Sequence, residues 1–158
     1  MVPFCILLRI LLRAWRTIPV TSLVLNDTNL IVVAALIESG GKLLVCQRRR
    51  GAPFELMWEF PGGKVESGES LEAALARELR EELSVTAIVG PEVYRTTHKY
   101  AGMPRAVELA FFRCDIAGTP QNLAFEQIAW RAARDLPTMD FLPADRELIH
   151  LLAAGSVR

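Results

Sequence analysis

The chain of 158 residues lacks the features that mark several large classes of protein. Its 18 basic and 18 acidic side chains cancel, so there is no charge excess for a broad face that binds duplex nucleic acid. The cysteines Cys5, Cys46 and Cys114 are odd in number and scattered, which fits neither a disulfide framework nor a zinc site. We therefore expect free thiols in a reducing compartment, the cytoplasm.

Acidic residues are absent from the N-terminus, where none precedes Asp27. The apolar residues 5–12 are interrupted by Arg9 and followed by Arg13, so the stretch is too short and too charged for stable membrane insertion. We expect residues 1–27 to be an extension, disordered or translated from a start upstream of the real one, before a domain over residues 28–155. The alternative is an amphipathic helix over residues 4–16, associated with a membrane surface or an organelle.

The remaining sequence has no internal repeat or low-complexity linker, and 51% of the chain is apolar, which is ordinary for one globular domain. Alternating or continuous apolar runs predict strands over residues 30–37, 42–47, 85–97, 106–116 and 125–130. Gly90 and Pro91 mark a candidate break in the third. We expect a loop over residues 48–57, a tight turn over residues 61–63, and a terminal helix opened by Pro143.

A helix is predicted after Ser70, which is a suitable N-cap. With an advance of about 100° per residue, its leucines form one apolar arc. The same arithmetic puts three glutamates along or inside the edge of that arc: Glu78, Glu81 and Glu82. Partly buried carboxylates repel one another unless a proton or a metal neutralises them, and hard oxygen ligands suit Mg²⁺, Mn²⁺ or Ca²⁺.

These glutamates belong to a run that resembles the Nudix box, Gly-x5-Glu-x7-Arg-Glu-U-x-Glu-Glu-x-Gly-U, in which U is a bulky aliphatic residue. Residues 63–85 match it at every fixed position except Ser84, where the pattern has a glycine that ends the helix in a left-handed conformation. Serine there costs about 1 kcal/mol and removes no metal ligand. The preceding Trp-Glu-Phe-Pro-Gly-Gly-Lys, residues 58–64, is similar to the MutT-like branch, and the resemblance covers residues 29–153.

The resemblance implies an α/β fold, the Nudix α/β/α sandwich with a mixed sheet between helices. It also implies a nucleoside triphosphate diphosphatase of the type that removes 8-oxo-dGTP from the nucleotide pool or hydrolyses CTP, with Mg²⁺ or alternatively Mn²⁺ as cofactor. The implied metal ligands are the carbonyl of Gly63 and the carboxylates of Glu78, Glu81 and Glu82, one of which can also take the proton from water. Arg77 and Glu69 are implied to hold these carboxylates in place.

Other site residues follow from the same resemblance. MutT-like enzymes use a glutamate from a later loop as a ligand or base, and Glu126 is the nearest match, with Glu108 and Asp115 as rivals. Arg48, fifteen residues before Gly63, corresponds to an arginine that grips phosphates, and Arg49 and Arg50 could assist it. Phe60 is expected to line the base pocket, which His98 or Tyr100 could also reach.

Asp145 stands where MutT has an asparagine that reads oxidised guanine. An ionised aspartate only accepts hydrogen bonds, which suits the amine of cytosine, whereas a protonated one could serve 8-oxo-guanine. Alternatively, Asp145 only caps the last helix. Two other functions stay open: hydrolysis of another nucleoside diphosphate derivative, such as a dinucleoside polyphosphate, and nucleotide binding without catalysis. The intact glutamates of the box argue against the second. The oligomeric state is open.

Overall fold

The structure is a computed structural model that describes residues 29–157; the predicted N-terminal extension lies outside these residues. No helix in the described part is long and apolar enough to cross a membrane. The elements in chain order are β1 (Leu30–Ser39), β2 (Lys42–Gln47), β3 (Trp58–Glu59), β4 (Gly62–Lys64), α1 (Leu71–Leu83), β5 (Thr86–His98), β6 (Val107–Ala117), β7 (Gln127–Arg131), the 3₁₀ helices η1 (Ala133–Thr138) and η2 (Pro143–Asp145), and α2 (Arg146–Ala153).

Strand β1 organises a mixed sheet, because it pairs in parallel with β6 and antiparallel with β2 and β4. The strand order along the main path is β3-β2-β1-β6-β5, and β7 pairs with β2. The aliphatic run of β1 is buried on both faces, as its continuous apolar sequence predicts. Its turn into β2 uses Gly40 and Gly41, which both have positive φ.

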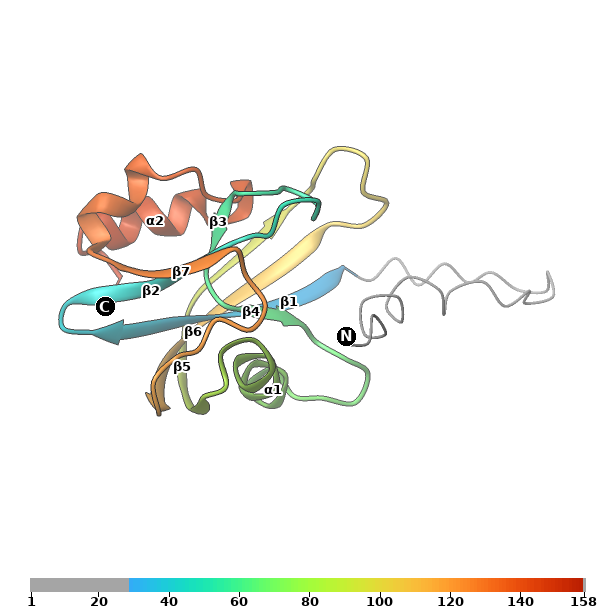
Figure 1. Cartoon of the computed structure of the whole chain (residues 1–158). Coiled ribbons are helices and arrows are strands. Elements are labelled where there is room, and N and C mark those ends of the chain that lie inside the picture. The colour runs from blue at the N-terminus through green and yellow to red at the C-terminus, as the bar shows by residue number, and fades with distance from the viewer. Residues whose placement is uncertain (1–28, 158) are drawn as a thin grey trace, which may run out of the picture.

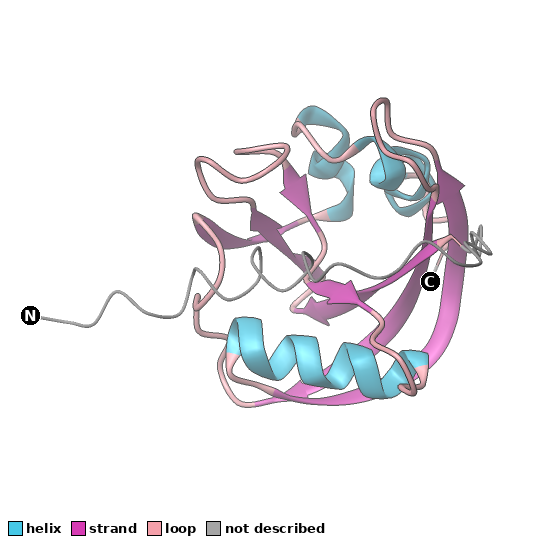
Figure 2. Ribbon diagram, turned by 90° about the vertical axis from the view of Figure 1, so that its right-hand side faces the viewer, coloured by secondary structure: helices cyan, strands magenta, loops and turns pink. Residues whose placement is uncertain are grey.

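Helices cover both faces of the sheet, α1 on one side and α2 with the 3₁₀ helices on the other (Figures 1 and 2). Successive β1 side chains serve the two layers in turn: Val33 and Ala35 pack with Leu75 and Leu79 of α1. Ala34 and Leu36 belong to the other layer, with side chains of α2. The architecture is the predicted α/β/α sandwich, and two buried layers flank the strand that positions the site.

The caps of α1 agree with the sequence interpretation. The Oγ of Ser70 accepts a hydrogen bond from the N–H of Ala73 at 3.1 Å, which satisfies one free donor of the first turn. Ser84 ends the helix with φ 56° and ψ 36°, the left-handed conformation that the sequence pattern reserves for glycine. The departure from the pattern therefore leaves the helix and its glutamates in place.

The predicted strands agree with the structure within one or two residues, and β5 carries the expected irregularity as register shifts between Val89 and Tyr94. The sequence reading missed β3, β4 and η1. Both strands are very short, and β4 contains the glycines of the predicted turn, which join β1 by backbone pairing and carry no apolar pattern. The free thiols of Cys46 and Cys114 are buried, as expected.

Candidate active site

The turn from β3 into β4 comes so close to its neighbours that two glycines are required. Gly62 has φ 149°, and a Cβ there would collide with the carbonyl oxygen of Val33 in β1. A Cβ on Gly63 would occupy the space of the Glu78 carboxylate. The turn is therefore wedged between the central strand and helix α1, with backbone facing acidic side chains.

Two of the three glutamates of the box meet this turn. The N–H of Gly62 donates to Oε2 of Glu82 at 3.1 Å, and the carboxylate of Glu78, one helical turn earlier, lies against Gly63. Glu81 differs, because its side chain is 60% exposed. The prediction that all three lie along or inside the buried edge is wrong for Glu81, since the turn packs on the flank of α1 that carries Glu78 and Glu82.

Burial makes this acidic pair unfavourable without a counter-charge. It raises the pKa of Glu82 to about 8, and the N–H of Gly62 opposes that rise while Glu78 and Glu59 add to it. Among residues 29–157, no three His, Cys, Asp or Glu side chains converge closely enough to form a metal site by themselves. The donors at the turn are nevertheless all oxygens, two of them carboxylates, which suits a hard divalent cation.

Arg77 links the acidic residues of the box. Its Nε and Nη2 donate to the two carboxylate oxygens of Glu69 at 2.8 and 2.9 Å, and its Nη1 donates to Glu78 at 2.9 Å. A fourth hydrogen bond, from Nη2, goes to the carbonyl of Lys64, in strand β4. Charge-assisted hydrogen bonds of this fork geometry are strong and directional. Arg77 therefore fixes the Glu78 carboxylate relative to the β4 turn.

The glycine turn opens into a cleft of about 640 Å³. Its polar lining comes from Arg48, Glu59, Lys64 and Glu82 and from the backbone of Gly62, Gly63 and Gly102. Apolar side chains line the rest: Val32, Pro53, Phe54, Tyr100, Ala101, Met103, Val107, Leu109, Leu142 and Ala144. A nucleotide has the same division, with charged phosphates at one end and a flat base at the other.

All three consecutive arginines are engaged within the protein. Arg48 lines the cleft, and its Nη1 donates to both oxygens of Glu59, at 2.8 and 3.0 Å. Arg49 donates to the carbonyls of residues 123 and 125, at 2.9 and 3.4 Å. Arg50 is exposed and lies 3.9 Å from Glu126. Only Arg48 among them borders the cleft, and its guanidinium is already paired with a carboxylate.

Asp145 is buried, with 2% of its surface exposed, and although it occupies the N-cap position of α2, its side chain makes no capping hydrogen bond. Its carboxyl instead accepts a hydrogen bond from the N–H of Phe60, and burial, followed by the charge of Glu59, raises its pKa well above the ordinary value. Asp145 lines a cavity of about 60 Å³ that shares Glu59, Gly62 and Leu142 with the cleft. The capping alternative is thus wrong, and the side chain lies at the inner end of the site.

The Phe60 side chain lies mainly in the core, whereas the sequence analysis expected it to line the base pocket. It is 3% exposed and packs against Phe111 and Phe141, with ring centroids 6.0 and 5.6 Å away. It borders the small inner cavity but not the main cleft. Alternation along the short β3 segment turns Trp58 and Phe60 to the same layer, so Phe60 serves the core while Glu59 faces the cleft.

The later-loop candidates separate in space. The loop of Glu126 lies beside the end of α1, because the N–H of Leu123 donates to the carbonyl of Glu82 at 3.0 Å. Glu126 itself is 40% exposed and borders no part of the cleft in this structure. Glu108 is paired with Arg95 on the outer face of β5 and β6. Glu126 is therefore the candidate nearest to the glutamates of the box.

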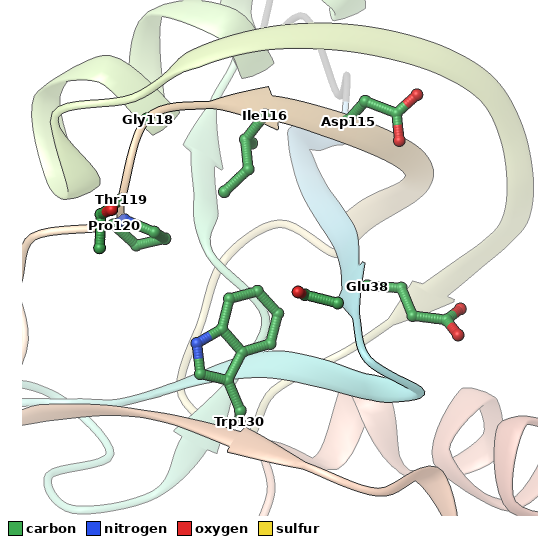
Figure 3. A pocket seen from close by; sticks show the side chains of 8 residues that line it. Glu38, Asp115, Ile116, Gly118, Thr119, Pro120 and Trp130 are labelled. Atoms are coloured by element: carbon green, nitrogen blue, oxygen red, sulfur yellow. The ribbon is translucent and has the colours of Figure 1, made fainter.

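Asp115, the other rival, borders a separate hollow of about 380 Å³ near the far end of β1 (Figure 3). The side chains of Trp130 and Ile116 face each other across it, while the carboxylates of Glu38 and Asp115 turn away to one side. This hollow shares no lining residue with the cleft. Asp115 therefore does not line the cleft that Glu82 borders.

Sequence reasoning missed Glu59 and Phe54 as residues of the cleft. Glu59 is a carboxylate only 18% exposed, and burial raises its pKa while Arg48 lowers it. Its position two residues before the glycine pair was a usable signal, because that turn had to face the site. Tyr100 was one of two candidates to reach the base, and it does line the cleft, whereas His98 does not but packs edge-on against Tyr100.

The fold and the acidic cleft define a hydrolase of the Nudix type, and comparison with known proteins agrees. The NUDIX domain family matches residues 27–152. CTP pyrophosphohydrolase of Escherichia coli is 39% identical over 124 residues, covering 78% of this chain and 90% of the relative. 8-oxo-dGTP diphosphatase of Haemophilus influenzae is 35% identical over 130 residues, covering 80% and 93%.

Solved structures show the same relationship. The solution structure of the E. coli ORF135 protein superposes with a TM-score of 0.71 at 37% identity, covering 79% of this chain and 89% of that chain. The crystal structure of a MutT NUDIX hydrolase from Burkholderia pseudomallei gives a TM-score of 0.70 at 27% identity, covering 78% and 97%. The chain belongs to the Nudix family, whose members generally require a divalent metal ion.

Proposed function

We propose that this protein hydrolyses nucleoside or deoxynucleoside triphosphates, oxidised or modified ones among them, to the monophosphate and pyrophosphate. The relatives named for CTP and 8-oxo-dGTP support this class of substrate. The observation that carries the proposal is the contact of Glu78 and Glu82 with the glycine turn that opens into the cleft. One end of the cleft suits phosphates with a cation, and the other suits a base.

The metal of the proposal is Mg²⁺, with Mn²⁺ as an alternative. Its ligands are the carboxylates of Glu78, Glu81 and Glu82 and the carbonyl of Gly63. When bound, such an ion neutralises phosphate charge and lowers the pKa of a coordinated water. The chain's own contribution is positional: Arg77 and Glu69 hold Glu78, and the N–H of Gly62 holds Glu82.

The proton of the attacking water goes to a carboxylate in this proposal, and two side chains are suited to receive it. Glu81 and Glu126 are both substantially exposed, 60% and 40%, so neither is committed to a buried hydrogen bond. Glu81 extends from the helix of the box, and Glu126 from the loop that Arg49 ties to the β2–β3 connection. Arg48 and Lys64 line the cleft and are the candidate cations for the phosphates, and Arg48 must share its guanidinium with Glu59.

Base recognition is assigned to the inner end of the cleft. Burial and the charge of Glu59 favour the neutral form of Asp145, and a neutral carboxyl offers an O–H donor as well as an acceptor. That state differs from the purely accepting aspartate that suits cytosine alone. A donor and an acceptor together are compatible with both cytosine and 8-oxo-guanine, in line with the two named relatives.

The test is the initial rate of pyrophosphate release with Mg²⁺ across normal dNTPs and NTPs, 8-oxo-dGTP, 5-methyl-dCTP and dinucleoside polyphosphates. Glu81→Gln is the variant of the site, and Glu72→Gln is its matched control, since Glu72 is exposed in the first turn of the same helix. We expect turnover of at least one triphosphate that is lost in Glu81→Gln and kept in Glu72→Gln. Turnover of diphosphate derivatives alone would refute the proposal, and binding without turnover would identify a recognition module.

A further inference from the structure

Two aromatic side chains from different loops meet at the edge of the cleft. Phe54 belongs to the β2–β3 loop and Tyr100 to the β5–β6 loop, and both line the cleft. Their ring centroids are 4.9 Å apart with an interplanar angle of 47°. The two loops extend from the same end of the molecule (Figure 1). We call this pair the aromatic clamp.

Phe54 has an unusual exposure and an unusual backbone conformation for an aromatic residue. It is 42% exposed although apolar, and its φ of 57° lies in the left-handed region that a residue with a Cβ adopts at a cost. Leu56 shares this conformation, with φ 61°. The core gains little from Phe54, so packing alone does not account for the conformation of the loop.

An ion pair keeps the loop in this conformation. The Nε of Arg48 donates to the carbonyl of Pro53 at 2.8 Å, directly before Phe54, while its Nη1 is held by Glu59. The amide of Gln47 donates to the carbonyl of Leu56 at 2.8 Å on the other side. Glu59 thus reaches Phe54 through Arg48, and the ion pair is mostly shielded from water, with 26% and 18% of the two side chains exposed.

We propose that the aromatic clamp binds the nucleobase of the substrate by stacking against its flat face, and that Glu59 is the positioning residue that sets the clamp through Arg48. This rests on the proposed function, because it names the part of the nucleotide that the apolar half of the cleft recognises. Stacking requires only a planar ring and is tolerant of base identity. Selection among bases then falls to groups that contact the base edge, such as Asp145.

The geometry supports this division. Tyr100 connects the clamp to the inner end of the site, because its hydroxyl is hydrogen-bonded to the backbone of Ala144, the neighbour of Asp145. The same apolar wall includes Leu142 and Met103. Glu82 and the two turn glycines line the same cleft as the clamp, so we infer that a base held by the clamp has its phosphates directed to the glycine turn.

The test measures binding by calorimetry with Mg²⁺, using CMP, 8-oxo-dGMP and inorganic tripolyphosphate as separate ligands. The variants are Phe54→Ala, Phe54→Leu and Tyr100→Ala, and Ile88→Ala is the control, because Ile88 is 68% exposed and lies outside the cleft. We expect Phe54→Ala to weaken both monophosphates about tenfold and to leave tripolyphosphate unchanged. Phe54→Leu should recover little, since it restores apolar bulk without a ring face.

Two further readouts separate stacking and positioning from a general loss of structure. If the rings act as one clamp, the Phe54→Ala/Tyr100→Ala double variant should lose no more affinity than the stronger single variant. Glu59→Gln should weaken monophosphate binding while tripolyphosphate binds equally or more tightly, because Arg48 is released. A general loss of structure would weaken all three ligands together.

The clamp proposal would be overturned if Phe54→Ala bound the monophosphates as tightly as the wild type does. It would also be overturned if Phe54→Ala lost as much affinity for tripolyphosphate as for the monophosphates. A wild-type protein that binds tripolyphosphate but no monophosphate would overturn it as well. The proposed function fails separately: a wild type that binds monophosphates through the clamp but releases no pyrophosphate from any triphosphate would refute the activity and leave the clamp standing.

Discussion

The backbone N–H of Gly62 donates to Oε2 of Glu82 at 3.1 Å, so a turn between two short strands holds a carboxylate of the next helix. The two residues are twenty positions apart, and the carboxylate of Glu78 lies against the neighbouring Gly63. Because the contacts come from backbone, the turn brings no side chain that would fill the space between the carboxylates. The glycine turn and the glutamates therefore form one structural unit.

The first prediction concerns Gly63→Ala. Gly63 has no positive φ, so alanine adds no backbone strain there, but its Cβ would displace the Glu78 carboxylate. We expect kcat in Mg²⁺ to fall about a hundredfold, as when the support of a metal ligand is lost, with weaker metal activation. Gly118→Ala is the control: φ is 100° and nothing lies within 4 Å of the added Cβ, so it should cost stability but not kcat. Equal kcat for the two variants would contradict the conclusion that the glycine turn and the glutamates form one structural unit.

Glu82 predicts a pH dependence of stability in the absence of metal. Its pKa rises from 4.5 to about 8 on folding, so the folded state holds the proton more tightly. The stabilisation that the folded protein gains from protonated Glu82 is complete below pH 4.5. It is lost as pH rises to about 8, and the free energy of unfolding then falls by at most about 1.4 kcal/mol per pH unit. Chemical denaturation in EDTA should show this slope, smaller in Glu82→Gln. The slope that remains in Glu82→Gln is expected from Glu59 and Asp145, because the pKa values of both are also raised on folding.

The same experiment with Mg²⁺ or Mn²⁺ should reverse the trend near pH 8. A bound cation stabilises the folded state and favours ionised carboxylates. The wild type should gain stability from metal, and Glu82→Gln should gain less. Identical slopes for the two proteins in EDTA would show that Glu82 does not take up a proton on folding.

Arg77→Lys tests the link between the acidic residues of the box. Lysine keeps the charge but cannot hold both oxygens of Glu69 and reach Glu78 at once. We expect kcat to fall about 10- to 100-fold with a smaller change in KM, measured as pyrophosphate release. Arg95→Lys is the matched control, because Arg95 forks between Glu92 and Glu108 away from the cleft. Parallel losses in both variants would indicate a general effect of removing a surface ion pair.

The sequence predicted those parts of the structure that have a local cause. Alternating or continuous apolar runs located the longer strands, and Ser70 and Ser84 correctly bounded α1, because caps depend on neighbouring residues only. The positions of Glu78 and Glu82 at the edge of the buried face followed from helical spacing. Their burial against the glycine turn explains why these two carboxylates, and not Glu81, contact backbone.

The missed features depend on contacts between distant segments. Strand β4 is defined by pairing with β1 rather than by its own residues, and the exposure of Glu81 depends on which flank of α1 the turn covers. Phe54 and Tyr100 are separated by 45 intervening residues and meet only because their loops extend from the same end of the fold. No periodicity within either segment signals such a meeting.

Asp145→Asn tests the protonation state at the inner end of the cleft. Asparagine retains an acceptor for the N–H of Phe60 and, like a neutral carboxyl, offers a donor as well. We expect kcat/KM at pH 7 to stay within about threefold of wild type for the preferred triphosphate, whereas Asp145→Leu loses about a hundredfold through unpaired partners. At higher pH the wild type should lose activity as Asp145 ionises, and Asp145→Asn should lose less. If Asp145→Asn is instead as inactive as Asp145→Leu at pH 7, the ionised carboxylate is the working form, and the accepting aspartate suited to cytosine is restored as the explanation.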